Sequence, residues 1–206
     1  SEDEIDKIIE TVVSSYEKAE GNNENRKGIA SERVKNELGD TTWNRISAEV
    51  KKMLISAEIS YDSLKDIKDV DYSPAVISLT KAVENILNEY IYHGGIYQYL
   101  CNHDLSGNSE YARIYHRDRE TRRKCPDESV TIGAFKYMFD NYATYAGETM
   151  KEVLRYDELD DTRIEIIEKI KCLLANVCEH RNHVAHKDGV DSDIMEECRK
   201  EIMTDQ

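Results

Sequence analysis

Apolar residues recur at three- and four-residue spacing along most of the chain, and this period constrains the fold more than any other feature. The longest such stripe begins at Ile164 and continues with helical spacing to Val184. Only 2 of the 206 residues are proline, so few positions interrupt a helix. No segment shows the regular alternation of apolar and polar residues that a set of β-strands requires. We therefore expect an all-α fold.

Cap and breaker residues divide this pattern into separate expected helices. The clearest helix start is Asp71-Tyr72-Ser73-Pro74, with Ser73 as N-cap and Pro74 at the first helical position. We expect an Asn-rich loop at Gly21–Gly28 and a kink or break at Gly94–Gly95. The expected helices cover Asp3–Glu20, Ile29–Leu38, Trp43–Tyr61 after a Thr41-Thr42 cap, Val76–Tyr90, Thr131–Phe139 and Ile164–Val184.

The C-terminal part of the chain carries a second set of boundary signals. Gly189 follows the longest stripe and suits the position just after a helix. Asp191-Ser192-Asp193 then supplies N-cap candidates for a last short helix. From these boundaries we divide the chain into an N-terminal helical region, residues 1–55, and a helical domain, residues 56–206.

Acidic residues outnumber basic residues by 42 to 28, which gives a formal net charge of −14. Such a chain repels polyanions at long range, so binding to nucleic acid requires a local basic patch. Residues 113–124 form one, with six Lys or Arg against two acids. The residues expected to contact phosphates are Arg113, Arg117, Arg119, Arg122, Arg123 and Lys124. The alternative for this run is a solvated helix face held by its own salt bridges.

Cysteine usage and hydropathy indicate the compartment. The 5 cysteines show no C-x-x-C spacing, which argues against a zinc ribbon and against a disulfide scaffold. Apolar runs are too short for a membrane span, and no signal peptide opens the chain. We therefore expect a cytoplasmic protein with reduced cysteines and no membrane partner. The start at Ser1 indicates a trimmed chain or a part of a longer polypeptide.

Arg181 is the residue whose expected position most needs a chemical explanation. It follows Leu174 by seven residues and Val177 by four, which places it on the apolar stripe of its own helix. An arginine on a packed face needs a charged partner, a snorkelling path or a cleft. The nearby histidines, His180, His183 and His186, fan across about 120° of a helix, so one ion could not easily collect all three. We expect no metal site and no cofactor.

The string Arg181-Asn182-His183-Val184-Ala185-His186 resembles the R-x(4–6)-H motif of the HEPN superfamily, including the polar residue after the arginine. Tyr72-Ser73-Pro74, followed by Leu79, Ala82 and Val83, resembles the long core helix of these domains, and Thr131-Ile132-Gly133 is a weaker match. The resemblance covers about residues 55–206. It implies a HEPN-like helical bundle with additional N-terminal helices.

HEPN domains are typically dimeric, and many are metal-independent endoribonucleases. The resemblance implies attack of an RNA 2′-hydroxyl on its own 3′-phosphate, which leaves a 2′,3′-cyclic phosphate and a 5′-hydroxyl. It implies His186 as the acid or base and Arg181 as the phosphate ligand, with Asn182 orienting the ribose hydroxyl or His186. It also implies a role in prokaryotic toxin–antitoxin pairs, abortive infection or other antiviral defence.

The expected partners are RNA, a second copy of the chain, and an antitoxin or sensor domain. Arg181 and His186 diverge by about 140° on an ideal helix, so a shared site requires a helix end near His186 or a second subunit. Two alternatives stay open at this point. One is a non-catalytic HEPN-like dimerisation or ligand-sensing module, and the other is a structural helical protein whose N-terminal helices bind a partner.

Overall fold

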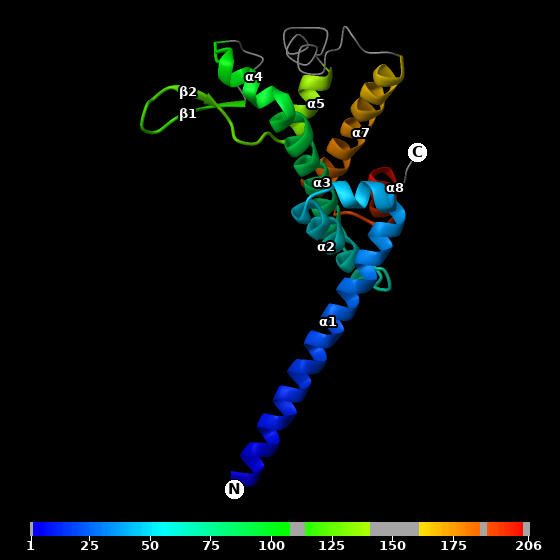
Figure 1. The fold of residues 1–206 in the computed structure, drawn as a ribbon. Helices are drawn as coiled ribbons and strands as arrows, with labels where there is room; N and C mark the ends of the chain where they lie inside the picture. Colours follow the sequence, from blue (N-terminus) through cyan, green and yellow to red (C-terminus); the bar gives the residue numbers. More distant parts are fainter. Residues whose placement is uncertain (1, 108–113, 141–160, 186–188, 204–206) are drawn as a thin grey trace.

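Helices dominate the structure, a computed structural model that describes residues 2–107, 114–140, 161–185 and 189–203 (Figure 1). The helices are α1 (Glu2–Arg45), α2 (Ala48–Leu64), α3 (Ser73–Leu87), the π-helix η1 (Asn88–Ile96), α4 (Tyr97–Asn102), α5 (Ile132–Asp140), α7 (Asp161–Ala185) and α8 (Ser192–Met203). Two short strands, β1 (Tyr115–Arg117) and β2 (Lys124–Pro126), pair as a hairpin. The all-α expectation is confirmed.

The first helix is longer than the sequence predicts, and its N-terminal half extends away from the rest of the molecule (Figure 1). The expected loop at Gly21–Gly28 is wrong, because α1 is helical throughout that stretch. The described side chains of that stretch, residues 23–28, are exposed, so their own burial does not hold the helix. Helix propensities differ by less than about 1 kcal/mol per residue, and the helix continues through this stretch from the turns that bury Ala30 and Val34. The helical geometry breaks instead at Gly39, whose φ is 74°.

The expected cap at Thr41-Thr42 is also wrong, because these residues lie inside α1. The next helix, α2, begins after Ser47, whose side chain accepts a hydrogen bond from the Val50 backbone N–H at 3.3 Å. This is ordinary N-cap geometry, moved toward the C-terminus relative to the expectation.

The core consists of two apolar clusters joined by α3. One cluster lies among α1, α2, α3 and α8 and contains Val34, Val50, Leu54, Val76, Leu79 and Met195. The other lies among α3, η1, α4, α5 and α7 and contains Val83, Tyr92, Ile96, Phe135, Phe139, Leu174 and Val177. The expected domain boundary at residue 55 falls inside α2, and Leu54 and Ala57 on its two sides belong to the same cluster.

The start of α3 is held by a carboxylate one residue before the cap. Pro74 lies in the first turn as expected, but the N-cap position is Tyr72 and not Ser73. Asp71 Oδ1 accepts hydrogen bonds from the Ser73 N–H at 3.0 Å, the Ser73 hydroxyl at 2.6 Å and the Val190 N–H at 2.9 Å. These bonds lower the pKa of Asp71, with the Ser73 hydroxyl as the largest cause. Gly189, beside Val190, has the expected positive φ, 71°.

The Gly94–Gly95 pair lies within the π-helix η1 and does not end the helical run, which continues into α4. The buried residues Asn88, Tyr92 and Ile96 recur every four positions. A π-turn holds more residues than an α-turn, so this spacing keeps all three on one face. The expected kink or break is therefore replaced by a change of helix type.

Polar side chains on α3 and η1, spaced by four residues, bind the backbone that leads from β2 into α5. Tyr92 donates to the Asp127 carbonyl at 2.7 Å, Asn88 exchanges two bonds with Val130 at 2.8 and 2.9 Å, and Glu84 accepts from the Ile132 N–H at 2.9 Å. The bound segment runs antiparallel to the helix. The hairpin is thus fixed to the helical body at its base.

Candidate functional site

The basic run at residues 113–124 is mostly a β-hairpin where the structure describes it, so the alternative of a solvated helix face is wrong. Its strands pair antiparallel, with Tyr115 opposite Pro126, His116 opposite Cys125 and Arg117 opposite Lys124. The connecting turn is organised by Asp118, whose Oδ1 accepts from the Thr121 N–H at 2.6 Å and the Glu120 N–H at 3.1 Å. These bonds lower the pKa of Asp118, the Thr121 backbone bond most of all.

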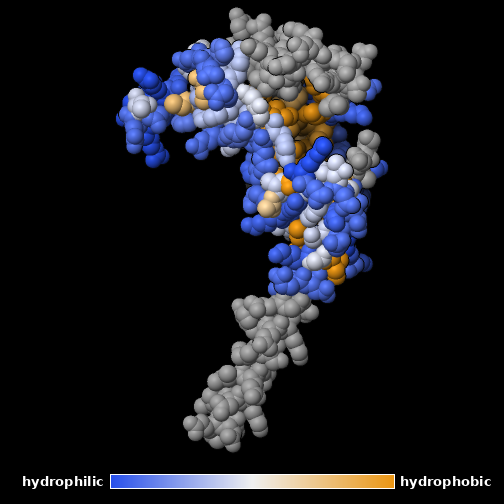
Figure 2. All heavy atoms as spheres, viewed as in Figure 1, coloured by the Kyte–Doolittle hydropathy of each residue, from blue (hydrophilic) through white to orange (hydrophobic). Residues whose placement is uncertain are grey.

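The cationic side chains of this hairpin point to solvent without carboxylate partners among the described residues. Arg117, Arg119, Arg122, Arg123 and Lys124 are exposed. None of them forms an ion pair within the described ranges, and Lys124 donates to the Ser106 carbonyl at 2.9 Å. Figure 2 shows hydrophilic residues over the projecting hairpin tip. Arg113 lies outside the described residues.

The motif on α7 is placed differently from the sequence expectation. Arg181 and Asn182 are both exposed, so the prediction that Arg181 lies on the packed face is wrong. The buried stripe runs from Leu174 through Val177 to His180, which is 6% exposed. The stripe shifts because α8 supplies His180 with a polar partner. His186 lies outside the described residues, as does the side chain of His183.

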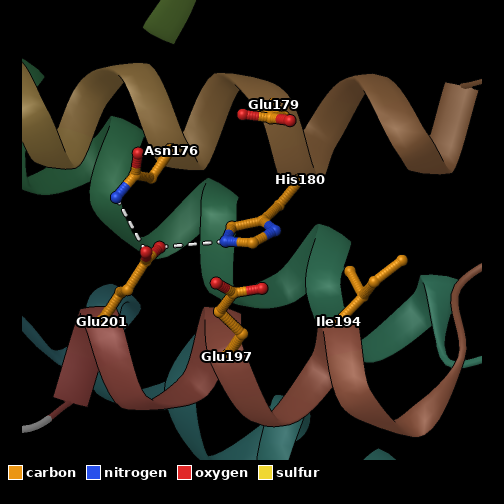
Figure 3. A pocket seen from close by; sticks show the side chains of 6 residues that line it. All are labelled: Asn176, Glu179, His180, Ile194, Glu197 and Glu201. Carbon is orange, nitrogen blue, oxygen red and sulfur yellow. Dashed lines mark hydrogen bonds and ion pairs between the residues drawn. The ribbon is translucent and has the colours of Figure 1, made fainter.

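That partner is Glu201 of α8, which joins two α7 side chains beside a pocket of about 160 Å³ (Figure 3). His180 Nε2 lies 2.9 Å from Glu201 Oε2, and the Asn176 amide donates to Glu201 Oε1 at 2.7 Å. Glu179, Glu197 and Ile194 complete the lining. His180 therefore lines this pocket and is itself buried.

Arg181 keeps an electrostatic influence on its own helix. Burial raises the pKa of the Cys178 thiol, and the positive charges of Lys136 and Arg181 oppose that shift. No ion pair involving Arg181 occurs among the described residues. Its guanidinium is therefore hydrated and accessible to an external anion.

A buried charge network, which has no signal in the sequence, joins α1, α2 and α8. Glu58 is fully buried and accepts from Arg33 at 3.1 Å and from Arg199 Nε at 2.5 Å. Arg199 also pairs with Glu37, and Arg33 with Asp62 at 2.9 Å. Burial alone would lower the pKa of Arg199, but the bonds and charges of Glu58 and Glu37 raise it overall. The network is structural, since the carboxylates already occupy both arginines.

The described ranges contain no group of three or more His, Cys, Asp or Glu side chains arranged to hold a metal ion. Among the described helices, none has the length and apolar character that a bilayer crossing requires. No protein-family model, curated protein or solved structure matches the chain.

Proposed function

We propose that this protein is a metal-independent endoribonuclease of the HEPN type that acts in prokaryotic toxin–antitoxin, abortive-infection or other antiviral defence. The observation that carries the proposal is exposed Arg181 at the C-terminal end of α7, which has no ion-pair partner among the described residues and is followed directly by exposed Asn182. An arginine fork matches two phosphate oxygens and stabilises charge that develops on them during cleavage. An arginine buried in an ion pair would lack this capacity.

The roles follow from the chemistry of each side chain in the motif. A histidine titrates near neutrality, so His186 takes a proton from the ribose 2′-hydroxyl in one copy and gives one to the leaving 5′-oxygen in the other. Arg181 holds the scissile phosphate, and Asn182 orients the attacking hydroxyl or the imidazole. The exposed arginines of the hairpin bind the RNA backbone beyond the scissile bond.

The proposal requires two copies of the motif, so we expect a symmetric homodimer whose interface includes α7 and extends to about residue 187. Light scattering at micromolar concentration should give about twice the 23.8 kDa chain mass. A monomer that persists with and without RNA would contradict the shared site.

Cleavage of a mixed-sequence RNA in excess EDTA tests the proposal directly. His186→Ala and Arg181→Ala should each lose about 10²–10⁴ in rate, because each removes a group that acts in the transition state. Lys169→Ala is the matched control, since Lys169 is also a basic, exposed residue of α7. Products should end in cyclic phosphate.

The outcomes separate the proposal from its alternatives. Equal cleavage by all variants would place the activity in another site or in a contaminating nuclease. Total tRNA and messenger RNA should also be tried as substrates, with and without the proteins encoded next to this one. If the protein binds these RNAs but cleaves none of them, the non-catalytic module is the correct interpretation.

A further inference from the structure

The hairpin carries a histidine–carboxylate pair, His116 and Asp127, beside its basic residues. His116 Nδ1 lies 2.8 Å from Asp127 Oδ1, and the two side chains are 49% and 32% exposed. When Nδ1 is bound to a carboxylate, the other ring nitrogen, Nε2, is directed away from it. In a half-exposed side chain, that nitrogen is available to a ligand from solvent.

The carboxylate of this pair is attached to a fixed piece of backbone. The Asp127 N–H donates to the Ile114 carbonyl at 2.8 Å, and the Asp127 carbonyl accepts from the hydroxyl of fully buried Tyr92 at 2.7 Å. Both neighbours of Asp127 in these bonds, Ile114 and Tyr92, belong to the same apolar cluster. The pair therefore sits at the rigid base of the hairpin and not at its tip.

The surroundings of His116 favour an anion over a cation. The next cross-strand pair along the ladder is Arg117 and Lys124, and the side chain directly opposite His116 is Cys125. Two negative groups interact with His116: Asp127, and Asp118 just after the end of the His116 strand. Asp127 is bound to His116, and Asp118 is bound to Thr121 and Glu120.

We propose that His116 is a phosphodiester-binding residue that, in its protonated form, bridges Asp127 and one backbone phosphate of a bound RNA strand. In this state Nδ1–H donates to the carboxylate and Nε2–H to a phosphate oxygen. The bond to the phosphate is charge-assisted at both ends. The contact adds one cation to the arginine row and makes RNA binding tighter below neutral pH. It rests on the proposed function, because it takes RNA as the polyanion on the hairpin.

Binding of a fluorescent 2′-O-methyl RNA, which lacks the attacking hydroxyl, measures this contact without cleavage. One additional phosphate contact should steepen the salt dependence by about 0.7 at pH 6 relative to pH 8, which is about fourfold in affinity at physiological salt. His116→Asn should abolish this difference between the two pH values. Asp127→Asn should reduce it, because the protonated imidazole loses its partner.

His103→Asn is the matched control, since His103 is exposed, lies outside the hairpin and, among the described residues, hydrogen-bonds through its ring to the Tyr99 carbonyl at 3.0 Å. It should retain the full pH difference. A pH difference that survives in His116→Asn, or no binding at either pH, overturns the inference. A mononucleotide that binds as tightly as the oligonucleotide would assign the site to a small phosphate ligand and overturn it too. If the wild type shows the pH-dependent salt slope but cleaves no RNA, the His116 contact stands and the proposed ribonuclease function is overturned.

Discussion

Arginines occupy two opposite environments in this protein. At the junction of α1, α2 and α8, Arg33 and Arg199 are bound to carboxylates, with Glu58 fully buried between them. On the hairpin, the four arginines from Arg117 to Arg123 are exposed and have no carboxylate partner among the described residues. The same side chain thus stabilises the fold in one region and is available to a ligand in the other.

The difference teaches how to assign arginines in a strongly acidic chain. Acidic residues outnumber basic ones by 42 to 28, so an arginine in this chain has many carboxylates that could neutralise it. On the hairpin, Asp118, one of the two acids in the basic run, is bound to Thr121 and to backbone N–H groups of the turn. Its carboxylate is therefore not available to the neighbouring arginines.

The largest expected effect is on stability and comes from removing an arginine of the buried charge network. Arg199→Ala leaves Glu58 buried with Arg33 as its remaining cation, which should lower the free energy of unfolding by about 3 kcal/mol. Urea denaturation measures the change. Arg123→Ala, an arginine from the hairpin, should change stability by less than about 0.5 kcal/mol. Similar losses in the two variants would erase the distinction between the regions.

Removing the exposed arginines of the hairpin should weaken RNA binding and leave the stability of the fold unchanged. Replacing Arg117, Arg122 and Arg123 together with Ala removes three phosphate contacts, so the salt slope of RNA binding should fall by about 2. Affinity at physiological salt should fall on the order of 50-fold. Preferred cleavage positions should not change, because backbone contacts carry no base information. An unaltered slope would assign these arginines to an inert surface.

A smaller effect is expected at Asp71, a carboxylate bound by neutral donors and not by arginines. Because its pKa is lowered in the folded state, its stabilisation is complete above the unfolded value near 4 and is lost as pH falls through the folded value. Asp71→Asn should therefore destabilise by about 0.5–1 kcal/mol at pH 7, since the site is exposed. The difference in unfolding free energy between the wild type and Asp71→Asn, measured by urea denaturation, should disappear in acid. A difference that grows in acid would contradict the lowered pKa of Asp71.

Local signals in the sequence predict the fold correctly where the intrinsic preference of a residue matches the conformation that the folded protein requires there. Pro74 marks the first turn of α3, and Gly189 adopts the positive φ expected beyond a helix. The prediction is wrong at Gly21–Gly28, where a helix that packs through Ala30 and Val34 continues through a loop-like composition. It also missed the hairpin, because two three-residue strands are too short to show an alternating pattern.

The candidate site was less accessible to sequence reasoning than the fold. The helical period counted from Leu174 and Val177 predicts Arg181 on the packed face of α7. In the structure the buried stripe is shifted by one residue, so that His180 is the buried side chain. That shift depends on Glu201 in another helix, which the periodicity of α7 does not contain. The pair of Arg199 and Glu58 is separated by 141 residues, and no local pattern announces it.

The strip of Glu84, Asn88 and Tyr92 has a consequence for which insertions the chain tolerates. These side chains bind Ile132, Val130 and Asp127 at fixed intervals, so a single added or deleted residue between 127 and 132 would misplace all the bonds on one side of the change. Within the described ranges, the hairpin tip, residues 118–123, forms no such hydrogen bonds to the helix. Related chains should therefore keep the length of the bound segment while the tip changes in size, which lets the basic surface vary without disturbing the helical body.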